Sequence, residues 1–196
     1  MGERMAAQIW IGGKLSTNLA GELCGAITTQ YVCLEFGDRQ FRPDNLQDLL
    51  QARIEHDGSR VLWLCDDQAS WGEFADLESF LQKHAIPYTR RSEGGGIYNG
   101  KIVEYRPGTD PVCIPVDASG SPTVDANAIR RAVKSLDTAL EQLEAGAVHK
   151  AALRLKRVRR FLRQQLPPDI PPLPDFEIEG YQQTDVNHGQ EPPGVC

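Results

Sequence analysis

The chain has 196 residues, a formal net charge of −6 and 40% hydrophobic residues, which is ordinary for a globular protein. No apolar run approaches the roughly 20 residues that a membrane span needs, and the N-terminus lacks the apolar segment of a signal peptide. We therefore expect a cytoplasmic protein with one domain, or with one domain and an appendage.

The cysteines and histidines indicate neither a disulfide framework nor a metal site. The five cysteines are odd in number and form no C-x-x-C pair. Cys33, Cys65 and Cys113 lie in apolar runs, where cysteine behaves as a small hydrophobic residue. The four histidines are scattered without the spacing of metal ligands. These patterns are typical of a reducing compartment, and we expect no cofactor.

The first 90 residues alternate between apolar runs of strand length and segments with helical spacing. The expected strands are 8–11, 31–36, 60–65 and 86–90. The expected helices begin near Ser16, Asp44 and Ser70, and the second of them ends at Gly58. The order βαβαβαβ predicts an α/β fold with a mostly parallel or mixed sheet flanked by helices.

A second interpretation depends on Gly37 and Asp38, which could form a tight hairpin turn. Residues 7–65 would then have the order βαββαβ, which is called ferredoxin-like. We favour the parallel arrangement of the two. From residue 90 onward, glycine-rich turns predict hairpins, with strands at 101–106 and 111–116. Residues 1–118 are therefore expected to form one α/β domain.

Residues 122–166 are expected to form a C-terminal antiparallel helical hairpin. Apolar residues recur at steps of four and three in its first helix: Ile129, Val133, Leu136, Leu140 and Leu143. A second periodic run follows: Val148, Ala152, Leu155, Val158 and Leu162. This spacing predicts that the two helices pack along these residues, with a short turn around Gly146. One continuous helix bent at Gly146 is the alternative, since a single glycine costs only about 1 kcal/mol.

The second of these helices is strongly basic. Seven bases lie within fourteen residues without any acid: Lys150, Arg154, Lys156, Arg157, Arg159, Arg160 and Arg163. Residues 121–166 carry a net charge of +6, whereas the segments before and after them each carry −6. The helix could be a solvated outer face, a surface for an acidic protein or for this chain's own acidic segments, or a nucleic-acid surface. If the helix binds a partner, we favour an acidic protein over nucleic acid, because the whole chain is acidic and Phe161 is the only aromatic residue in the run.

Residues 167–196 are expected to form an extended acidic tail, because they contain seven of the thirteen prolines. Within the tail, residues 175–181 combine acids with Phe176, Ile178 and Tyr181. Large apolar side chains are rare in a purely polar tail, so this segment is predicted to dock onto the chain's own body or onto a partner. Phe176, Ile178 and Tyr181 therefore join the seven bases as candidate partner-binding residues.

Two further groups of charged residues are candidate sites. Glu35, Asp66 and Asp67 lie at or just after the ends of predicted strands, where α/β proteins bind ligands, and carboxylates there could hold Mg²⁺. No nearby lysine or histidine completes a catalytic set, and acids are also common at loop starts, so we assign neither a metal site nor a catalytic residue. Arg90 and Arg91 precede three glycines and could hold an anion, although a hairpin tip explains the same residues.

The sequence therefore favours a non-catalytic binding or regulatory protein, such as an inhibitor or adaptor. It would engage an acidic macromolecular partner through the basic helix and the docking tail. One alternative is a Mg-dependent enzyme that processes phosphoesters with the strand-end carboxylates. The other is a nucleic-acid-binding protein that uses the basic helix. No membrane partner is expected.

Overall fold

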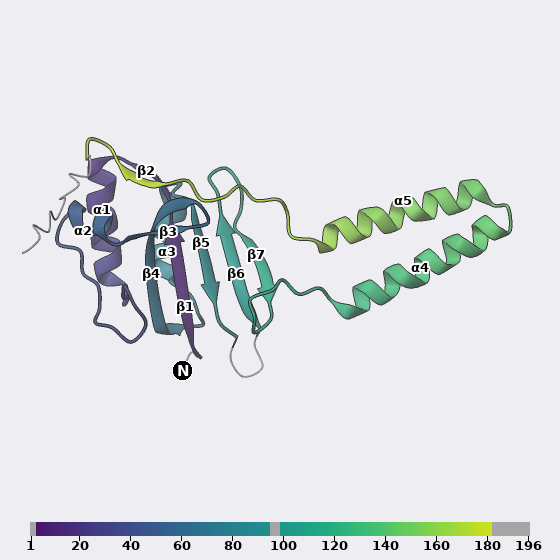
Figure 1. The fold of residues 1–196 in the computed structure, drawn as a ribbon, viewed down its shortest axis with the longest axis horizontal. Coiled ribbons are helices and arrows are strands. Elements are labelled where there is room, and N and C mark those ends of the chain that lie inside the picture. The colour runs from purple at the N-terminus through teal and green to yellow at the C-terminus, as the bar shows by residue number, and fades with distance from the viewer. Residues whose placement is uncertain (1–2, 95–98, 182–196) are drawn as a thin grey trace, which may run out of the picture.

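The computed structural model describes residues 3–94 and 99–181, which form a body around a six-stranded sheet and a long arm of two helices (Figure 1). The strands are β1 (Arg4–Ile11), β2 (Gly13–Leu15), β3 (Arg53–His56), β4 (Ser59–Ser70), β5 (Tyr88–Ser92), β6 (Gly100–Tyr105), β7 (Val112–Val116) and β8 (Phe176–Ile178). The helices are α1 (Thr17–Thr29), α2 (Leu46–Gln51), α3 (Ala75–Lys83), α4 (Ala126–Glu144) and α5 (Val148–Gln165). Helices α1, α2 and α3 belong to the body, and α4 and α5 form the arm.

The order of the strands in the main sheet is β3-β4-β1-β5-β6-β7, and every neighbouring pair is antiparallel. The prediction of a mostly parallel or mixed sheet is therefore wrong. Elements β1, α1, β3, β4, α3 and β5 follow the βαββαβ order of the less favoured interpretation, with β6 and β7 added at one edge. The hairpin within that order lies between β3 and β4, not at Gly37 and Asp38.

A two-residue turn at Asp57 and Gly58 sets this antiparallel arrangement. The two residues have φ values of 50° and 81°, and His56 pairs with Ser59 across the turn. Positive φ at both positions matches the right-handed twist of the flanking strands, and Asp-Gly is a favoured sequence for such a turn. The expected helix ending at Gly58 is wrong beyond Gln51, because the chain leaves α2 there and starts β3.

The expected strand at residues 31–36 is also wrong. These residues lie in the loop between α1 and α2, where Cys33 forms an isolated bridge with Cys65 of β4. Cys33 N–H donates to Cys65 O at 2.7 Å, and Cys65 N–H donates back to Cys33 O at 2.9 Å. The apolar run therefore attaches a loop to the sheet through one antiparallel bridge.

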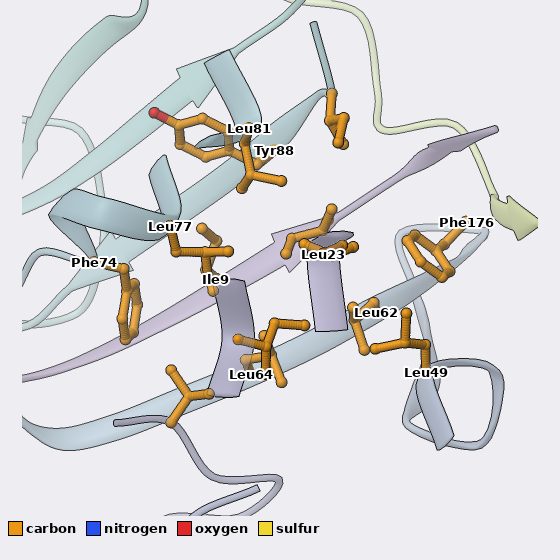
Figure 2. Close-up of a cluster of buried hydrophobic side chains, with 14 of the residues drawn as sticks. Ile9, Leu23, Leu49, Leu62, Leu64, Phe74, Leu77, Leu81, Tyr88 and Phe176 are labelled. Carbon is orange, nitrogen blue, oxygen red and sulfur yellow. The ribbon is translucent and has the colours of Figure 1, made fainter. Parts of the chain in front are cut away.

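The main core of the body lies between the sheet and helices α1, α2 and α3 (Figure 2). Side chains of a strand alternate between its two faces, and Ile9 in β1 and Leu62 in β4 point into this core. Leu23 from α1, Leu49 from α2 and Leu77 from α3 cover them. The core is thus built by residues 7–105 together with the strand that returns after the arm.

That returning strand, β8, pairs in parallel with β2 and places Phe176 and Ile178 in the main core. Glu179 N–H donates to Leu15 O at 2.8 Å, which extends the pairing. Where the chain passes Gly12, a Cβ atom would lie 2.3 Å from Pro174 O, so only glycine permits this approach. The two helices are therefore not a C-terminal hairpin with a free tail: they lie between two parts of the body, and the fold-class prediction is wrong on this point too.

Helices α4 and α5 extend away from the sheet and run side by side in opposite directions (Figure 1). They contact chiefly each other, whereas α1, α2 and α3 contact the rest of the body. Within the described residues, no helix is long and apolar enough to cross a membrane. Most residues of α4 and α5 are exposed, because the two helices make few contacts with the body.

Candidate functional site

Small residues form the contact between the two helices of the arm. Ala128, Ala132 and Ala139 of α4 are buried, and Ala151 and Val158 of α5 are buried opposite them. Alanine lets helix backbones approach closely. The arm is therefore held together along a stripe of alanines and one valine.

The ends of α4 are well defined by local hydrogen bonds. The Asp125 side chain caps its first turn by accepting from Asn127 N–H at 2.9 Å. At the other end Gly146 has a φ of 74°, and Ala147 N–H donates to Gln142 O at 2.8 Å. This is the glycine-centred ending that stops many helices. Residues 145–147 separate α4 from α5, so the alternative of one bent helix is wrong.

The apolar residues that were predicted to join the two helices lie largely outside the contact. In α4, each buried alanine is followed directly by one of these larger apolar residues. Because one residue turns 100° around a helix, the larger residue then points away from α5. Ile129, Val133, Leu140 and Leu143 are consequently between 40% and 56% exposed. The prediction was wrong here because the periodicity of leucine and valine was used, whereas the alanine stripe with the same period forms the closer contact.

The displaced residues of both helices lie on the same side of the arm. They form a surface that we call the apolar face: Ile129, Val133, Leu136, Leu140, Leu143, Val148, Leu155, Leu162 and Leu166. Between the helices this face is hollowed into a groove of about 500 Å³ that includes Leu136, Leu155 and Leu162. Lys156, Arg159 and Arg163 line the same groove.

The seven bases of α5 are spread around the helix, and we call them together the basic face, although Lys156, Arg159 and Arg163 also border the groove. Six of them are exposed and Arg154 is half-buried. In the described part of the chain no carboxylate lies within 4.0 Å of any of these seven bases. On α4, Arg131 pairs with Asp125 at 3.7 Å and lies 5.9 Å from the centre of the Phe161 ring. The acidic groups of residues 3–94 and 99–181 thus do not neutralise the basic face.

The tail residues have two different environments. Phe176 and Ile178 are 0% and 3% exposed and belong to the core of the body, so the segment docks onto its own chain. Arg53 NH1 donates to Phe176 O at 3.0 Å, and Asp175 accepts from Arg60 N–H at 2.8 Å. Tyr181 is 45% exposed. Buried in this way, Phe176 and Ile178 offer no surface to a partner, and residues 182–196 lie outside the described residues.

Glu35, Asp66 and Asp67, the candidate carboxylates of the alternative Mg²⁺ site, are not arranged as a metal site. Asp66 and Asp67 lie inside β4 rather than after it, and Glu35 is exposed in the loop before α2. Asp66 is buried, accepts from Gln68 N–H at 2.8 Å, and has its pKa raised by that burial. Among residues 3–94 and 99–181, no group of three or more His, Cys, Asp or Glu side chains could hold a metal ion.

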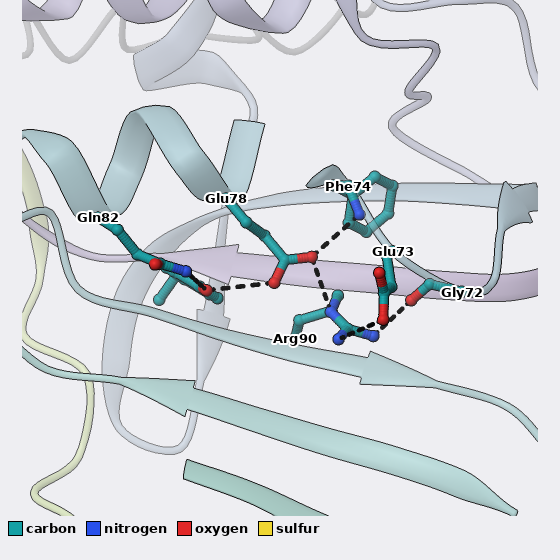
Figure 3. Close-up of polar contacts among 7 residues, drawn as sticks. Gly72, Glu73, Phe74, Glu78, Gln82 and Arg90 are labelled. Carbon is teal, nitrogen blue, oxygen red and sulfur yellow. Dashed lines mark hydrogen bonds and ion pairs between the residues drawn. The ribbon is translucent and has the colours of Figure 1, made fainter. Parts of the chain in front are cut away.

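Arg90, for which an anion-binding role was the alternative to a hairpin tip, is buried beneath α3 and already paired (Figure 3). Its Nε lies 2.8 Å from Glu78 Oε1, and its NH1 donates to the carbonyl of Gly72. Glu78 also accepts from Phe74 N–H at 3.0 Å and from the Tyr88 hydroxyl at 3.1 Å. This network holds α3 against β5, so the anion proposal for Arg90 is wrong.

Two residue patterns that shape the arm and the sheet are present in the sequence but were not predicted to have these roles. Ala128, Ala132 and Ala139 of α4 recur at helical spacing, and Asp57 and Gly58 are a favoured hairpin pair. Comparisons of this chain with protein-family models, with curated proteins and with solved structures found no match.

Proposed function

We propose that this chain is a non-catalytic binding protein of the regulator, inhibitor or adaptor class, and that its basic face engages an acidic protein partner. The observation that supports this most directly is the state of the seven bases of α5. They lie on an arm outside the body, and no carboxylate of the described residues pairs with them. The body then serves to support and orient the arm.

The charge pattern of α5 is costly for an isolated helix. Bases follow one another at steps of three and four residues, such as Lys150, Arg154 and Arg157. Like charges at this spacing destabilise a helix by about 0.2–0.5 kcal/mol per pair. An acidic partner surface would remove this repulsion on binding, and it would gain charge-assisted hydrogen bonds to arginine.

Two features favour protein over nucleic acid as the partner. The chain as a whole carries a net charge of −6, which opposes the approach of a polyanion at long range. Phe161, which is the one Phe, Tyr or Trp residue on α5, is half-buried beside Arg131 and offers no platform on which bases could stack. The four described cysteines, Cys24, Cys33, Cys65 and Cys113, are free thiols, which fits the cytoplasm that we propose as its location.

The test is capture of partners from a nuclease-treated native extract, with protein and nucleic acid both quantified. Arg157→Glu/Arg160→Glu/Arg163→Glu should abolish capture while leaving the body folded. The matched control, Arg39→Glu/Lys83→Glu/Lys101→Glu, reverses three exposed bases of the body and should retain capture. Submicromolar binding of the wild type to DNA or RNA at about 0.15 M salt, lost in the α5 variant, would overturn the proposal.

A further inference from the structure

The apolar face of the arm is too extensive to be explained by the fold of one chain. Leu140 and Val148 are 56% and 62% exposed, and Leu166 is 62% exposed. The face runs along the whole of α4, which at 1.5 Å per residue is about 28 Å long. Scattered exposed leucines are normal, but a continuous apolar stripe on two adjacent helices marks an interaction surface.

We infer that this face binds the same face of a second copy of the chain, giving an antiparallel four-helix assembly of two arms. Two helices side by side are about 20 Å wide, so the face covers roughly 560 Å² in projection, which is of the order of the about 800 Å² per partner of a standard interface. Residues spaced by three and four along both helices are the pattern of a four-helix core. This proposal goes beyond the proposed function, because it concerns self-association of the chain through its apolar face.

The charges along α4 indicate that the partner of the apolar face is a second copy of the chain. On its edge away from α5, the first half carries Arg130 and Lys134, and the second half carries Asp137, Glu141 and Glu144. Two such helices running antiparallel place the basic half of each beside the acidic half of the other. Within one chain the same segregation is unfavourable, because Arg130 with Lys134 and Asp137 with Glu141 are like charges four residues apart.

The charges also choose between the two symmetric arrangements of the arms. If the arms ran parallel, α4 of one copy would lie beside α5 of the other, and Arg130 and Lys134 would face Arg159 and Arg163. In the antiparallel arrangement α5 lies beside α5 of the second copy. The groove-lining bases in the second half of α5 then face the first half of α5 in the second copy. There the same edge of the helix carries the uncharged Ala152. A two-fold axis at right angles to the helices is therefore the favoured symmetry.

The assembly leaves a basic surface for the partner of the proposed function. Lys150, Arg157 and Arg160 lie on the side of α5 turned away from the apolar face, counting 3.6 residues per turn. Two copies would present this surface twice. Such duplication strengthens binding to a partner that carries two acidic sites.

The first experiment measures the mass of the full-length protein in solution by analytical ultracentrifugation. The wild type should be a dimer at micromolar concentration. Val133→Glu/Leu140→Glu should weaken dimerisation at least about 100-fold, with unchanged helix content, because both side chains are already half-exposed within one chain. The control, Asn127→Glu/Gln164→Glu, adds the same two charges elsewhere on the arm and should remain dimeric.

The second experiment tests the antiparallel arrangement by exchanging charges on α4. Arg130→Glu/Lys134→Glu and Asp137→Lys/Glu141→Lys/Glu144→Lys should each be monomeric, because each variant repels itself. Mixed one to one, they should form a heterodimer. If the wild type is monomeric up to about 100 µM, self-association through the apolar face is overturned. This holds even if lipid or another protein covers the apolar face instead. Dimers of the Arg130→Glu/Lys134→Glu variant alone overturn the antiparallel arrangement.

Discussion

Replacing Phe176 with alanine should destabilise the whole body, although the residue follows both helices of the arm. Its side chain is 0% exposed and packs in the main core with residues of β1, β4 and α2. Truncating a fully buried phenylalanine costs about 3–5 kcal/mol in free energy of unfolding. A domain of this size has about 5–15 kcal/mol in total, and each kcal/mol corresponds to about 2–4 °C in Tm.

Urea unfolding, followed by circular dichroism, measures this loss. Tyr181→Ala is the matched control, because that ring is 45% exposed and its removal should change stability by no more than about 0.5 kcal/mol. Hydrogen exchange adds a local readout, since the Glu179 N–H that donates to Leu15 O should lose its protection in Phe176→Ala. A loss below about 1 kcal/mol would refute the placement of β8 in the core.

Three further predictions concern the body. Glu78→Gln should lower the free energy of unfolding by about 3–5 kcal/mol, because it removes the nearer of the two carboxylates that pair with the buried Arg90 guanidinium and leaves only Glu73 at 4.0 Å; urea unfolding measures this, and a loss under about 1 kcal/mol would argue against the pair. Cys65 should react with iodoacetamide at about pH 8 far more slowly than the exposed Cys113, because burial and the nearby carboxylates raise its pKa to about 12; equal rates in the folded protein would contradict this. Burial raises the pKa of the Asp66 carboxyl in the folded state. As pH rises, the unfolded state therefore loses the Asp66 proton first, and the free energy of unfolding of the wild type falls over the pH range between the two pKa values. The stability of Asp66→Asn relative to wild type should therefore increase from about pH 3 to about pH 7, and a pH-independent difference would count against the shift.

Local sequence signals predicted the parts of the body that depend on neighbouring residues. Ser16 caps α1 as expected, with its side chain accepting from Leu19 N–H at 3.3 Å. The apolar run at residues 60–65 forms part of β4, inside the sheet. Strand direction could not be obtained in the same way, because it depends on whether the chain reverses between two elements. In this chain the reversal is made by the turn at Asp57 and Gly58, and Gly58 had been predicted to end a helix.

The arm shows why periodicity alone does not identify a contact. Alanine and leucine stripes run along α4 with the same spacing, one residue apart, and both satisfy an amphipathic pattern. The stripe of leucine, isoleucine and valine was predicted to be the contact because of its spacing. In the structure the alanines face α5, since their small size permits close approach, and the leucines remain for another surface. The sequence marks both stripes, but only the three-dimensional packing assigns them.

The central claim is that the arm carries the binding activity and the body supports it. The direct measurement compares partner capture by the intact protein with capture by a variant whose residues 125–165 are replaced by a Gly-Ser linker of about 12 residues, which spans about 20 Å. We expect the variant to keep the cooperative unfolding transition of the body, because α4 and α5 contact chiefly each other. We expect it to lose capture completely, because the basic face is removed with α5. Undiminished capture by the armless protein would contradict the account and place the binding surface on the sheet and its helices.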